Sequence, residues 1–331
     1  MQPIGRSRGE PLDKLYDAVV QFVAMESATT RSYQQLHHDA LAALHRICSA
    51  VLDCEDAGCE RADIIRVLEP VRRIHSRSPF VRRLQSWPRG YPGDFETVEY
   101  IHRAENGAPE STIERHCEAY SLNFPIAQQH RNKIRHQANA IVKTLIARRR
   151  PRILAMACGG CPDFREVLPH LERSRAELWL NDADPSALEF ARKRLATIGA
   201  RLHFEEGNAL QLMRRWARGP AFHLILAGGL FDYLQERHAI FLIANAWKLL
   251  SRRGGTFFLT NIAAGNPYRA LIEYVGDWFL IERSEPELRD LIERAGVPRD
   301  AVSIRLDETR LAWLVEMTKS FGDLPRPRDR Y

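Results

Sequence analysis

The sequence predicts an α/β protein, in which an all-helical N-terminal part precedes a mainly parallel β-sheet with an antiparallel edge hairpin. Up to about residue 148, apolar residues recur at helical spacing and no alternating β-branched run appears. From Pro151 onward, short β-rich runs alternate with helical segments, which is typical of a parallel sheet with right-handed crossovers. The last two β-rich runs are only a few residues apart, so they predict the hairpin.

The length and composition set the domain organisation. A chain of 331 residues is long enough for two domains, and we place the boundary at "RRRP", giving parts 1–148 and 149–331. Hydrophobic residues make up 45% and charged residues 27%, as in ordinary globular proteins. No apolar run approaches about 18 residues, and the N-terminus lacks the apolar region of a secretory signal. We therefore expect a cytoplasmic protein without a membrane span.

The helical part contains one irregular segment, "RGYPGDFE" (89–96), where Pro and Gly predict a rigid turn between helices. Such loops often carry function, so Tyr91 and Asp94 become candidate catalytic residues. Asp94 could instead cap the helix that begins at "FETVEYIH". Further on, Pro125 suits the first turn of one long helix that continues toward Arg150.

The sheet part begins with a strand that ends in "ACGGC", where two interpretations compete. Gly159 and Gly160 allow a tight turn that approaches a ligand, because parallel strands present their carboxyl ends to the ligand-binding crevice. Cys158 and Cys161 could instead be a Cys-x-x-C metal or redox pair. No second Cys or His pair follows at zinc-ligand spacing, and His37-His38-Asp39 has no partner at such spacing either. We therefore expect no metal and treat both cysteines as packing residues.

Polar and small residues follow the next predicted strands in an order that suits a nucleoside ligand. Asp182 can accept both ribose hydroxyls, and Asn208 can read an adenine edge beside the small Ala209. Asp182 could also cap a helix, although Asp184 is the better capping candidate, and Asn208 could be a turn residue. The predicted cofactor-binding residues are Ala157, Cys158, Gly159, Asp182, Ala183, Asn208, Ala209, Gly228 and Gly229. The expected strands cover 152–157, 176–181, 201–206, 222–227 and 256–261, followed by the hairpin "AVSIRLDE" and "LAWLVEMTK".

The ordered set "ILAMACGG", "LNDADPSAL", "EEGNAL", "AFHLILAGGL" and "LLSRRGGTFFLTN" resembles class I S-adenosylmethionine-dependent methyltransferases. The resemblance covers Pro151 to the C-terminus and implies a Rossmann-like fold and S-adenosyl-L-methionine as cofactor. The chain departs from that pattern at Ala155, where the family usually has an acid, and at Asn208, where it often has Asp. A narrower similarity, carried by "RGYPGDFETVEYI", "ACGG", "GLFDYL" and "EYVGDWFLIER", is to a bacterial group that includes 3-hydroxypalmitate methyl ester-forming methyltransferases.

The acceptor site is expected near the helical part and the end of the fourth strand. Tyr233 could face the sulfonium with its ring, so it joins Tyr91 and Asp94 as a catalytic candidate. Arg131 and Arg135 lie one helical turn apart and could bind a carboxylate, or they could be solvated surface charges. The predicted substrate-binding residues are Arg131, Arg135 and Asp232.

These expectations point to an S-adenosylmethionine-dependent O- or N-methyltransferase acting on a small molecule, either a secondary metabolite or a signal precursor. An alternative is intramolecular alkyl transfer, in which the cofactor's own amine attacks and methylthioadenosine leaves. A non-catalytic cofactor-binding protein would explain the departures at Ala155 and Asn208. An RNA methyltransferase is a further alternative, because the formal net charge of +6 includes basic residues in the predicted helices that could bind RNA. The sequence shows no recognisable RNA-binding module, so we expect no nucleic-acid partner.

Overall fold

A computed structural model describes residues 9–27 and 32–319. The chain divides into two compact units, which are described separately. Unit 1 comprises the chain up to Gln128 together with Pro267–Phe279, and unit 2 comprises Gln129–Asn266 together with Leu280 onward. Within the described ranges, no helix combines the length and the apolar character needed to cross a membrane.

Unit 2 contains the predicted sheet. Its seven described strands lie in the order β3-β2-β1-β4-β5-β7-β6. The strands are β1 (Arg152–Met156), β2 (Glu177–Asp182), β3 (Leu202–Glu206), β4 (Leu224–Gly228), β5 (Thr256–Ile262), β6 (Val302–Leu306) and β7 (Ala312–Thr318). The first five strands are parallel to one another, whereas β7 pairs antiparallel with both β5 and β6. The predicted fold class is confirmed, and the hairpin forms one edge with β6 outermost.

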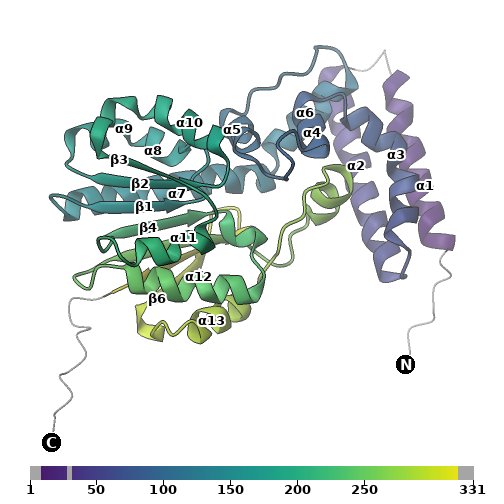
Figure 1. The fold of residues 1–331 in the computed structure, drawn as a ribbon. Coiled ribbons are helices and arrows are strands. Elements are labelled where there is room, and N and C mark those ends of the chain that lie inside the picture. Colours follow the sequence, from purple (N-terminus) through teal and green to yellow (C-terminus); the bar gives the residue numbers. More distant parts are fainter. Residues whose placement is uncertain (1–8, 28–31, 320–331) are drawn as a thin grey trace, which may run out of the picture. The chain divides into compact units, whose positions relative to one another are not determined.

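The burial of each strand follows its place in the sheet. Along β1, β4 and β5 nearly every residue is buried, because helices cover both faces of these central parallel strands. Edge strand β6 alternates between half-buried and exposed residues. One face packs against α7 (Pro125–Ala147), α8 (Pro162–Glu166), α9 (Leu168–Arg173) and α10 (Pro185–Arg194). The other face packs against α11 (Ala209–Trp216), α12 (Glu236–Leu249) and α13 (Glu285–Arg294) (Figure 1).

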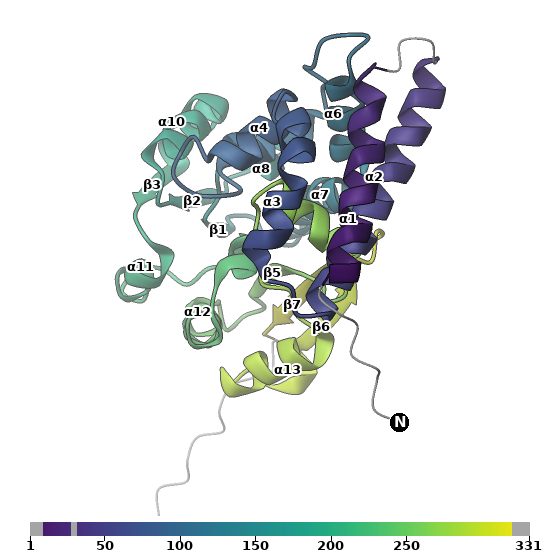
Figure 2. The same cartoon turned by 90° about the vertical axis from the view of Figure 1, so that its right-hand side faces the viewer.

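Unit 1 is helical, as predicted for this part of the chain. Its helices are α1 (Gly9–Val23), α2 (Tyr33–Asp56), α3 (Arg61–His75), α4 (Pro79–Ser86), α5 (Phe95–Arg103) and α6 (Ile113–Asn123). Helix α1 packs against both α2 and α3 (Figure 2), and the fully buried Phe22 and Leu68 belong to this core. The segment Pro267–Phe279 is tied to α3 by an ion pair of 2.5 Å between Arg72 and Asp277.

The division into units runs differently from the boundary placed after residue 148. Residues 129–147 of α7 belong with the sheet, because Ala138 and Ile141 are buried in the core formed with β1 and β2. Pro267–Phe279 belongs with the helices although it follows β5 in sequence. The single long helix predicted from Pro125 is confirmed as α7, and the role of the helical part in acceptor binding remains a prediction.

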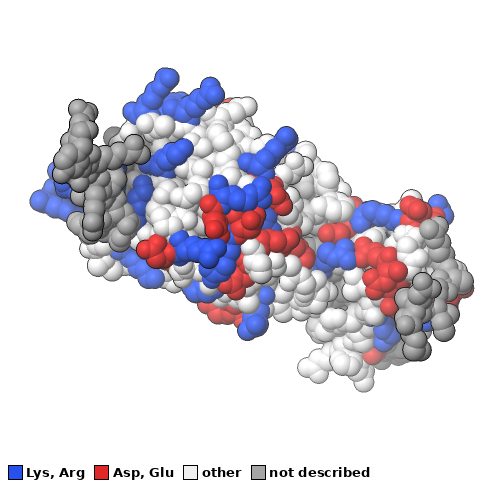
Figure 3. Space-filling view, turned by 90° about the horizontal axis from the view of Figure 1, so that it is seen from below, with Lys and Arg blue, Asp and Glu red and all other residues white. Residues whose placement is uncertain are grey.

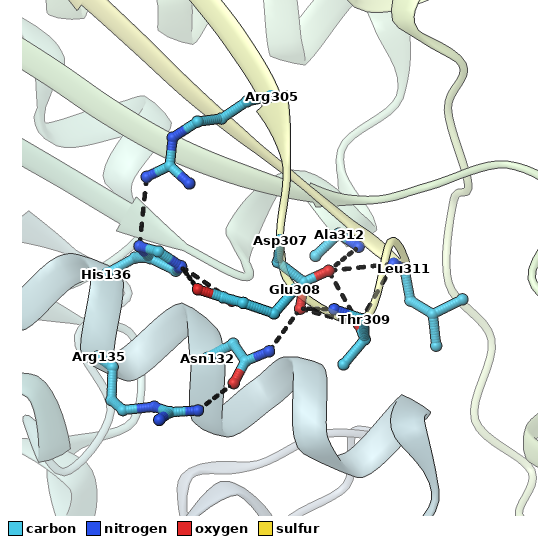
Figure 4. A network of polar contacts seen from close by, with 9 residues as sticks. All are labelled: Asn132, Arg135, His136, Arg305, Asp307, Glu308, Thr309, Leu311 and Ala312. Carbon is cyan, nitrogen blue, oxygen red and sulfur yellow. Dashed lines mark hydrogen bonds and ion pairs between the residues drawn. The ribbon is translucent and has the colours of Figure 1, made fainter.

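A buried carboxylate in the turn between β6 and β7 connects the hairpin to α7 (Figure 4). Asp307 accepts hydrogen bonds from the Asn132 side chain at 2.8 Å and from the backbone amides of Leu311 and Ala312 at 3.0 Å. The hydroxyl and the backbone amide of Thr309 also donate to the Asp307 carboxylate. Burial alone would raise the pKa of Asp307, but these donors outweigh it and lower the pKa below its usual value.

We expect Asp307→Asn to lower the free energy of unfolding by about 1–2 kcal/mol at pH 7, because the amide cannot accept all of these bonds. A carboxyl whose folded-state pKa is lowered stabilises the protein above its unfolded pKa, near 3.9, and loses that effect as the pH falls through the folded value. Urea unfolding of both proteins between pH 7 and pH 3 should show the difference shrinking only below about pH 4. A difference that stays constant with pH would contradict this role of the carboxylate.

Candidate functional site

The turn after β1 has the backbone geometry of a ligand-binding turn. Ala157, Gly159 and Cys161 all adopt positive φ angles of 49°, 53° and 55°. The Cys158 amide donates to the carbonyl of Asn181 at 2.9 Å, which fixes the turn against the end of β2. Only glycine adopts such angles without strain, so Gly159 is explained by the turn itself.

The two cysteines of this turn are protonated packing residues rather than reactive thiols. A hydrogen bond to Cys161, together with burial, holds the pKa of Cys158 well above its usual range, and burial raises the pKa of Cys161. Both are free thiols. Within the described part of the chain, no three His, Cys, Asp or Glu side chains are grouped so that they could hold a metal ion.

Asp182, at the end of β2, connects the first two strand ends. Its carboxylate accepts from the Gly159 amide at 2.8 Å and from the Asp184 amide at 2.9 Å. Burial raises the pKa of Asp182, while these backbone bonds act in the opposite direction. The carboxylate has about four acceptor positions, so capacity remains for other donors. The alternative that Asp184 caps the next helix is confirmed, since its side chain accepts from the Ser186 amide.

The third strand end is held in place by a residue that the sequence reasoning missed. Asn181 donates to the carbonyls of Glu205 and Gly207, both at 2.8 Å, and so joins the ends of β2 and β3. The sequence signal for this role was the side-chain amide residue that directly precedes Asp182 in "LNDADP". Asn208 is exposed and caps α11 by accepting from the Leu210 amide at 2.9 Å, which leaves its amide nitrogen available as a donor. Ala209 is the first residue of that helix.

The end of β4 places its two glycines in different environments. A Cβ at Gly228 would overlap the side chain of Gln137, so this glycine makes room for a buried amide of α7. Gly229 has φ of 105°, and a Cβ there would meet nothing within 4 Å. Of the two glycines, only Gly229 therefore borders unfilled space. Ala183, between Asp182 and Asp184, is exposed.

Asp232, predicted to bind substrate, is 2% exposed and engaged in a polar network. It pairs with the buried ammonium of Lys133 at 2.8 Å and accepts from the Ile262 amide at 2.6 Å and from Asn261 at 3.1 Å. These contacts give Asp232 a structural role in holding α7 against the strand ends. Tyr233, the next residue, is 40% exposed. Sequence reasoning missed Lys133 and Gln137, although their spacing of four residues along a long helix indicated a shared buried face.

The two candidate arginines of α7 have different surroundings. Arg131 is half-buried, and burial together with the neighbouring Arg135 lowers its pKa. Arg135 is exposed and donates to the side chain of Asn132, next to the hairpin network (Figure 4). Burial also holds the pKa of the neighbouring His130 well below its usual range. Arg131 is thus the better-placed candidate for a ligand carboxylate.

Tyr91 and Asp94 belong to unit 1, so their proximity to the other candidates stays a prediction. Asp94 is 2% exposed and caps α5 by accepting from the amides of Glu96 and Thr97. It also pairs with Arg83 at 2.6 Å. The capping alternative for Asp94 is confirmed. Tyr91 is 38% exposed.

The predicted cofactor-binding residues are brought to one edge of the sheet. Because β3, β2, β1 and β4 are adjacent and parallel, the segments after all four strands meet at their carboxyl ends. In unit 2, this edge carries a carboxylate, an amide and positive-φ backbone, which suit a ligand with hydroxyl groups and a base.

Comparison with known proteins found solved structures of similar fold. No protein-family model and no curated protein matches the chain. A solved structure from Bordetella parapertussis, described as a possible exported protein, is 15% identical over 95% of this chain and 97% of its own, with a TM-score of 0.55. Magnesium protoporphyrin IX methyltransferase from Synechocystis, solved with bound S-adenosylhomocysteine, is 13% identical over 69% of this chain and 100% of its own, with a TM-score of 0.45. An N-methyltransferase from Bradyrhizobium japonicum, also with S-adenosylhomocysteine, is 14% identical over 68% and 97%, with a TM-score of 0.41. At these identities the likeness concerns the fold.

Proposed function

We propose that the protein is an S-adenosyl-L-methionine-dependent methyltransferase that acts on a small molecule. The observation that carries the proposal is the contact between the Asp182 carboxylate and the Gly159 amide at the carboxyl edge of a 3-2-1-4-5-7-6 sheet. It places a half-buried acid directly beside a positive-φ turn, which is the arrangement expected for a nucleoside bound across two strand ends. The motif set that resembles class I methyltransferases includes both residues.

The residues present fit this cofactor. Asp182 retains acceptor capacity for ribose hydroxyls, and the Asn208 amide nitrogen can donate to the adenine. The space beside Gly229 can admit the remainder of the molecule. No acid stands at Ala155, so another group of the chain must face the cofactor's ammonium.

The bound cofactor supplies an activated methyl group on a sulfonium. The protein's contribution is to align the acceptor atom with that carbon and to exclude water, so positioning provides most of the rate. We assign Tyr233, exposed after β4, to the acceptor side. Arg131 would orient an anionic or planar heteroaromatic acceptor. A carboxylate acceptor needs no general base, whereas an alcohol or an amide-type nitrogen does.

We propose no nucleic-acid acceptor, because the sequence shows no recognisable RNA-binding module. On the face shown in Figure 3, Lys and Arg side chains are interspersed with Asp and Glu near the middle of the view and predominate toward its upper left. Exposed ion pairs such as Arg294 with Asp290 and Arg289 with Glu285 neutralise part of the basic charge. Nucleic-acid-binding surfaces carry a basic patch or stripe. We propose a cytoplasmic location, which the free thiols of all six cysteines support.

The proposal is tested by incubating the full chain with methyl-labelled cofactor and a panel of small carboxylic acids, phenols and heteroaromatic amines. We expect label in one acceptor class and S-adenosylhomocysteine as the by-product. Methylthioadenosine instead would establish the intramolecular alkyl transfer. Binding of the cofactor without label transfer to any member of the panel would contradict the methyltransferase assignment and favour a binding protein.

A further inference from the structure

Arginines collect at the amino edge of the sheet in unit 2, which is the edge opposite to the candidate cofactor site. They lie in the segments that lead into β1, β2, β4 and β5, and their side chains are exposed. Within these segments, residues 148–151, 173–176, 217–223 and 250–255 include no Asp or Glu. We call the group the basic edge, and it comprises Arg149, Arg150, Arg173, Arg175, Arg218, Arg252 and Arg253.

Backbone hydrogen bonds hold the four segments side by side. The Glu177 amide, at the start of β2, donates to the carbonyl of Pro151 at 2.9 Å. The His223 amide, just before β4, donates to the carbonyl of Arg152 at 2.8 Å, and the Thr256 amide of β5 donates to the carbonyl of His223 at 3.0 Å. Neighbouring strands are about 4.8 Å apart, so the arginines that precede them are brought onto one continuous surface.

The chain supplies no counter-charge to these arginines. In the ranges that the structure describes, none of the seven guanidinium groups forms a hydrogen bond or an ion pair with another residue. Exposed arginines elsewhere in the same unit are paired, as Arg289 is with Glu285 at 2.6 Å and Arg299 with Glu293 at 2.7 Å. Like charges gathered on one surface repel one another and destabilise the compact state. An anionic partner would remove that repulsion.

An apolar side chain is exposed beside the basic edge. Ile146, in the last turn of α7, is 81% exposed, more than any other large hydrophobic residue that the structure describes. Two residues later, the Arg148 guanidinium donates to the carbonyl of Gly254 at 3.2 Å, which ties the end of α7 to the segment before β5. An exposed aliphatic side chain next to arginines suits the boundary of a bilayer, where apolar groups enter between lipid headgroups and basic groups meet phosphates.

We propose that the basic edge docks unit 2 onto a bilayer that contains anionic phospholipids, with Ile146 inserted among the headgroups. Guanidinium groups bind phosphate through paired, charge-assisted hydrogen bonds. Each basic residue near such a surface strengthens binding by about fivefold, so several together hold a protein without a membrane span. The proposal goes beyond methyl transfer and does not depend on it.

Single-stranded nucleic acid is the other polyanion that an arginine-rich edge can bind, and the structure favours it less. Such binding combines basic groups with aromatic side chains on which bases stack. Phe222 is the only Phe, Tyr or Trp in the four segments, and it is 1% exposed. The exposed apolar group is instead the aliphatic Ile146, which offers no ring for stacking.

Docking through the amino edge leaves the cofactor edge accessible. The strands β1, β2, β3 and β4 are parallel, so Asp182 and the turn after β1 lie at the opposite ends of the strands from the basic edge. Cofactor and by-product could therefore exchange with water while the basic edge contacts the bilayer.

The test is co-sedimentation of the full chain with vesicles of phosphatidylcholine that contain about one-third phosphatidylglycerol, at about 0.1 M salt. We expect binding to these vesicles and not to pure phosphatidylcholine. The double variant Arg149→Gln with Arg150→Gln should bind about 30-fold more weakly, as two losses of about fivefold. Ile146→Ser should bind at least about threefold more weakly, because less apolar surface leaves water.

The matched control is Arg66→Gln with Arg73→Gln, which changes the net charge equally at two exposed positions of α3 in unit 1. We expect its affinity to change less than about threefold. Equal weakening in both double variants would overturn the proposal, since net charge and not the basic edge would then drive binding. So would a lack of binding up to about 1 mM lipid. Tighter binding to a single-stranded RNA oligonucleotide, lost in Arg149→Gln with Arg150→Gln but kept in Ile146→Ser, would assign the edge to nucleic acid instead.

Discussion

Asp182→Ala should weaken the binding of S-adenosylhomocysteine by about 5- to 150-fold, or about 1–3 kcal/mol. Two effects contribute to this loss. The variant removes a charged acceptor for two ribose hydroxyls, and it releases the Gly159 amide, whose 2.8 Å bond to Asp182 holds the turn after β1. Isothermal titration calorimetry with the intact chain measures the change. Because burial raises the pKa of Asp182, affinity in the wild type should also begin to fall at a higher pH than for an ordinary carboxyl.

Asp184→Ala is the matched control for this experiment. Asp184 lies two residues away and caps α10 by accepting from the Ser186 amide. Its loss should lower the free energy of unfolding by about 1 kcal/mol, as for other N-caps, while affinity changes less than about threefold. Equal affinities of the wild type and Asp182→Ala would remove Asp182 from the cofactor site. Equal losses in both variants would show that the effect arises from the loop and not from the carboxylate.

Most of the sheet could be predicted because its strands are chemically distinct from their connections. In β4, "LILAG" is a continuous apolar run bounded by polar residues, which is the pattern of a strand buried on both faces. The order of turns after the strands then predicted one ligand-binding edge, since parallel strands all end there. The hairpin could be predicted because few residues separate β6 from β7 in the sequence. The position of β7 between β5 and β6 could not, because it depends on pairing between strands that are far apart in the chain.

The contacts of the candidate site residues that the sequence did not reveal share a physical cause. Asp94 and Asp232 are acids next to a predicted site, and a sequence does not reveal that their carboxylates are occupied by Arg83, by Lys133 and by backbone amides. Gly228 suggested an approach to ligand, whereas the structure fills that space with Gln137. Each case depends on contacts between segments far apart in the chain.

The buried pair of Lys133 and Asp232 should make Lys133→Met one of the most destabilising single changes in the sheet unit. Lys133 is 3% exposed and Asp232 is 2% exposed, so neither charge reaches water. Removing one partner of a buried ion pair leaves the other without its direct counter-charge, at a cost of about 3–5 kcal/mol in the free energy of unfolding. Urea unfolding monitored by circular dichroism measures this loss.

The double variant Lys133→Met with Asp232→Asn separates the charge from the packing. It removes both charges of the pair, while the amide oxygen at position 232 can still accept from the Asn261 side chain and from the Ile262 amide. We expect it to recover at least half of the lost stability, since most of the cost of Lys133→Met is the unpaired carboxylate rather than the lost attraction. If the double variant were as unstable as Lys133→Met, the lysine would act mainly by filling space between α7 and the strand ends. If Lys133→Met alone lost less than about 1 kcal/mol, as an exposed pair would, the pair would be hydrated in solution.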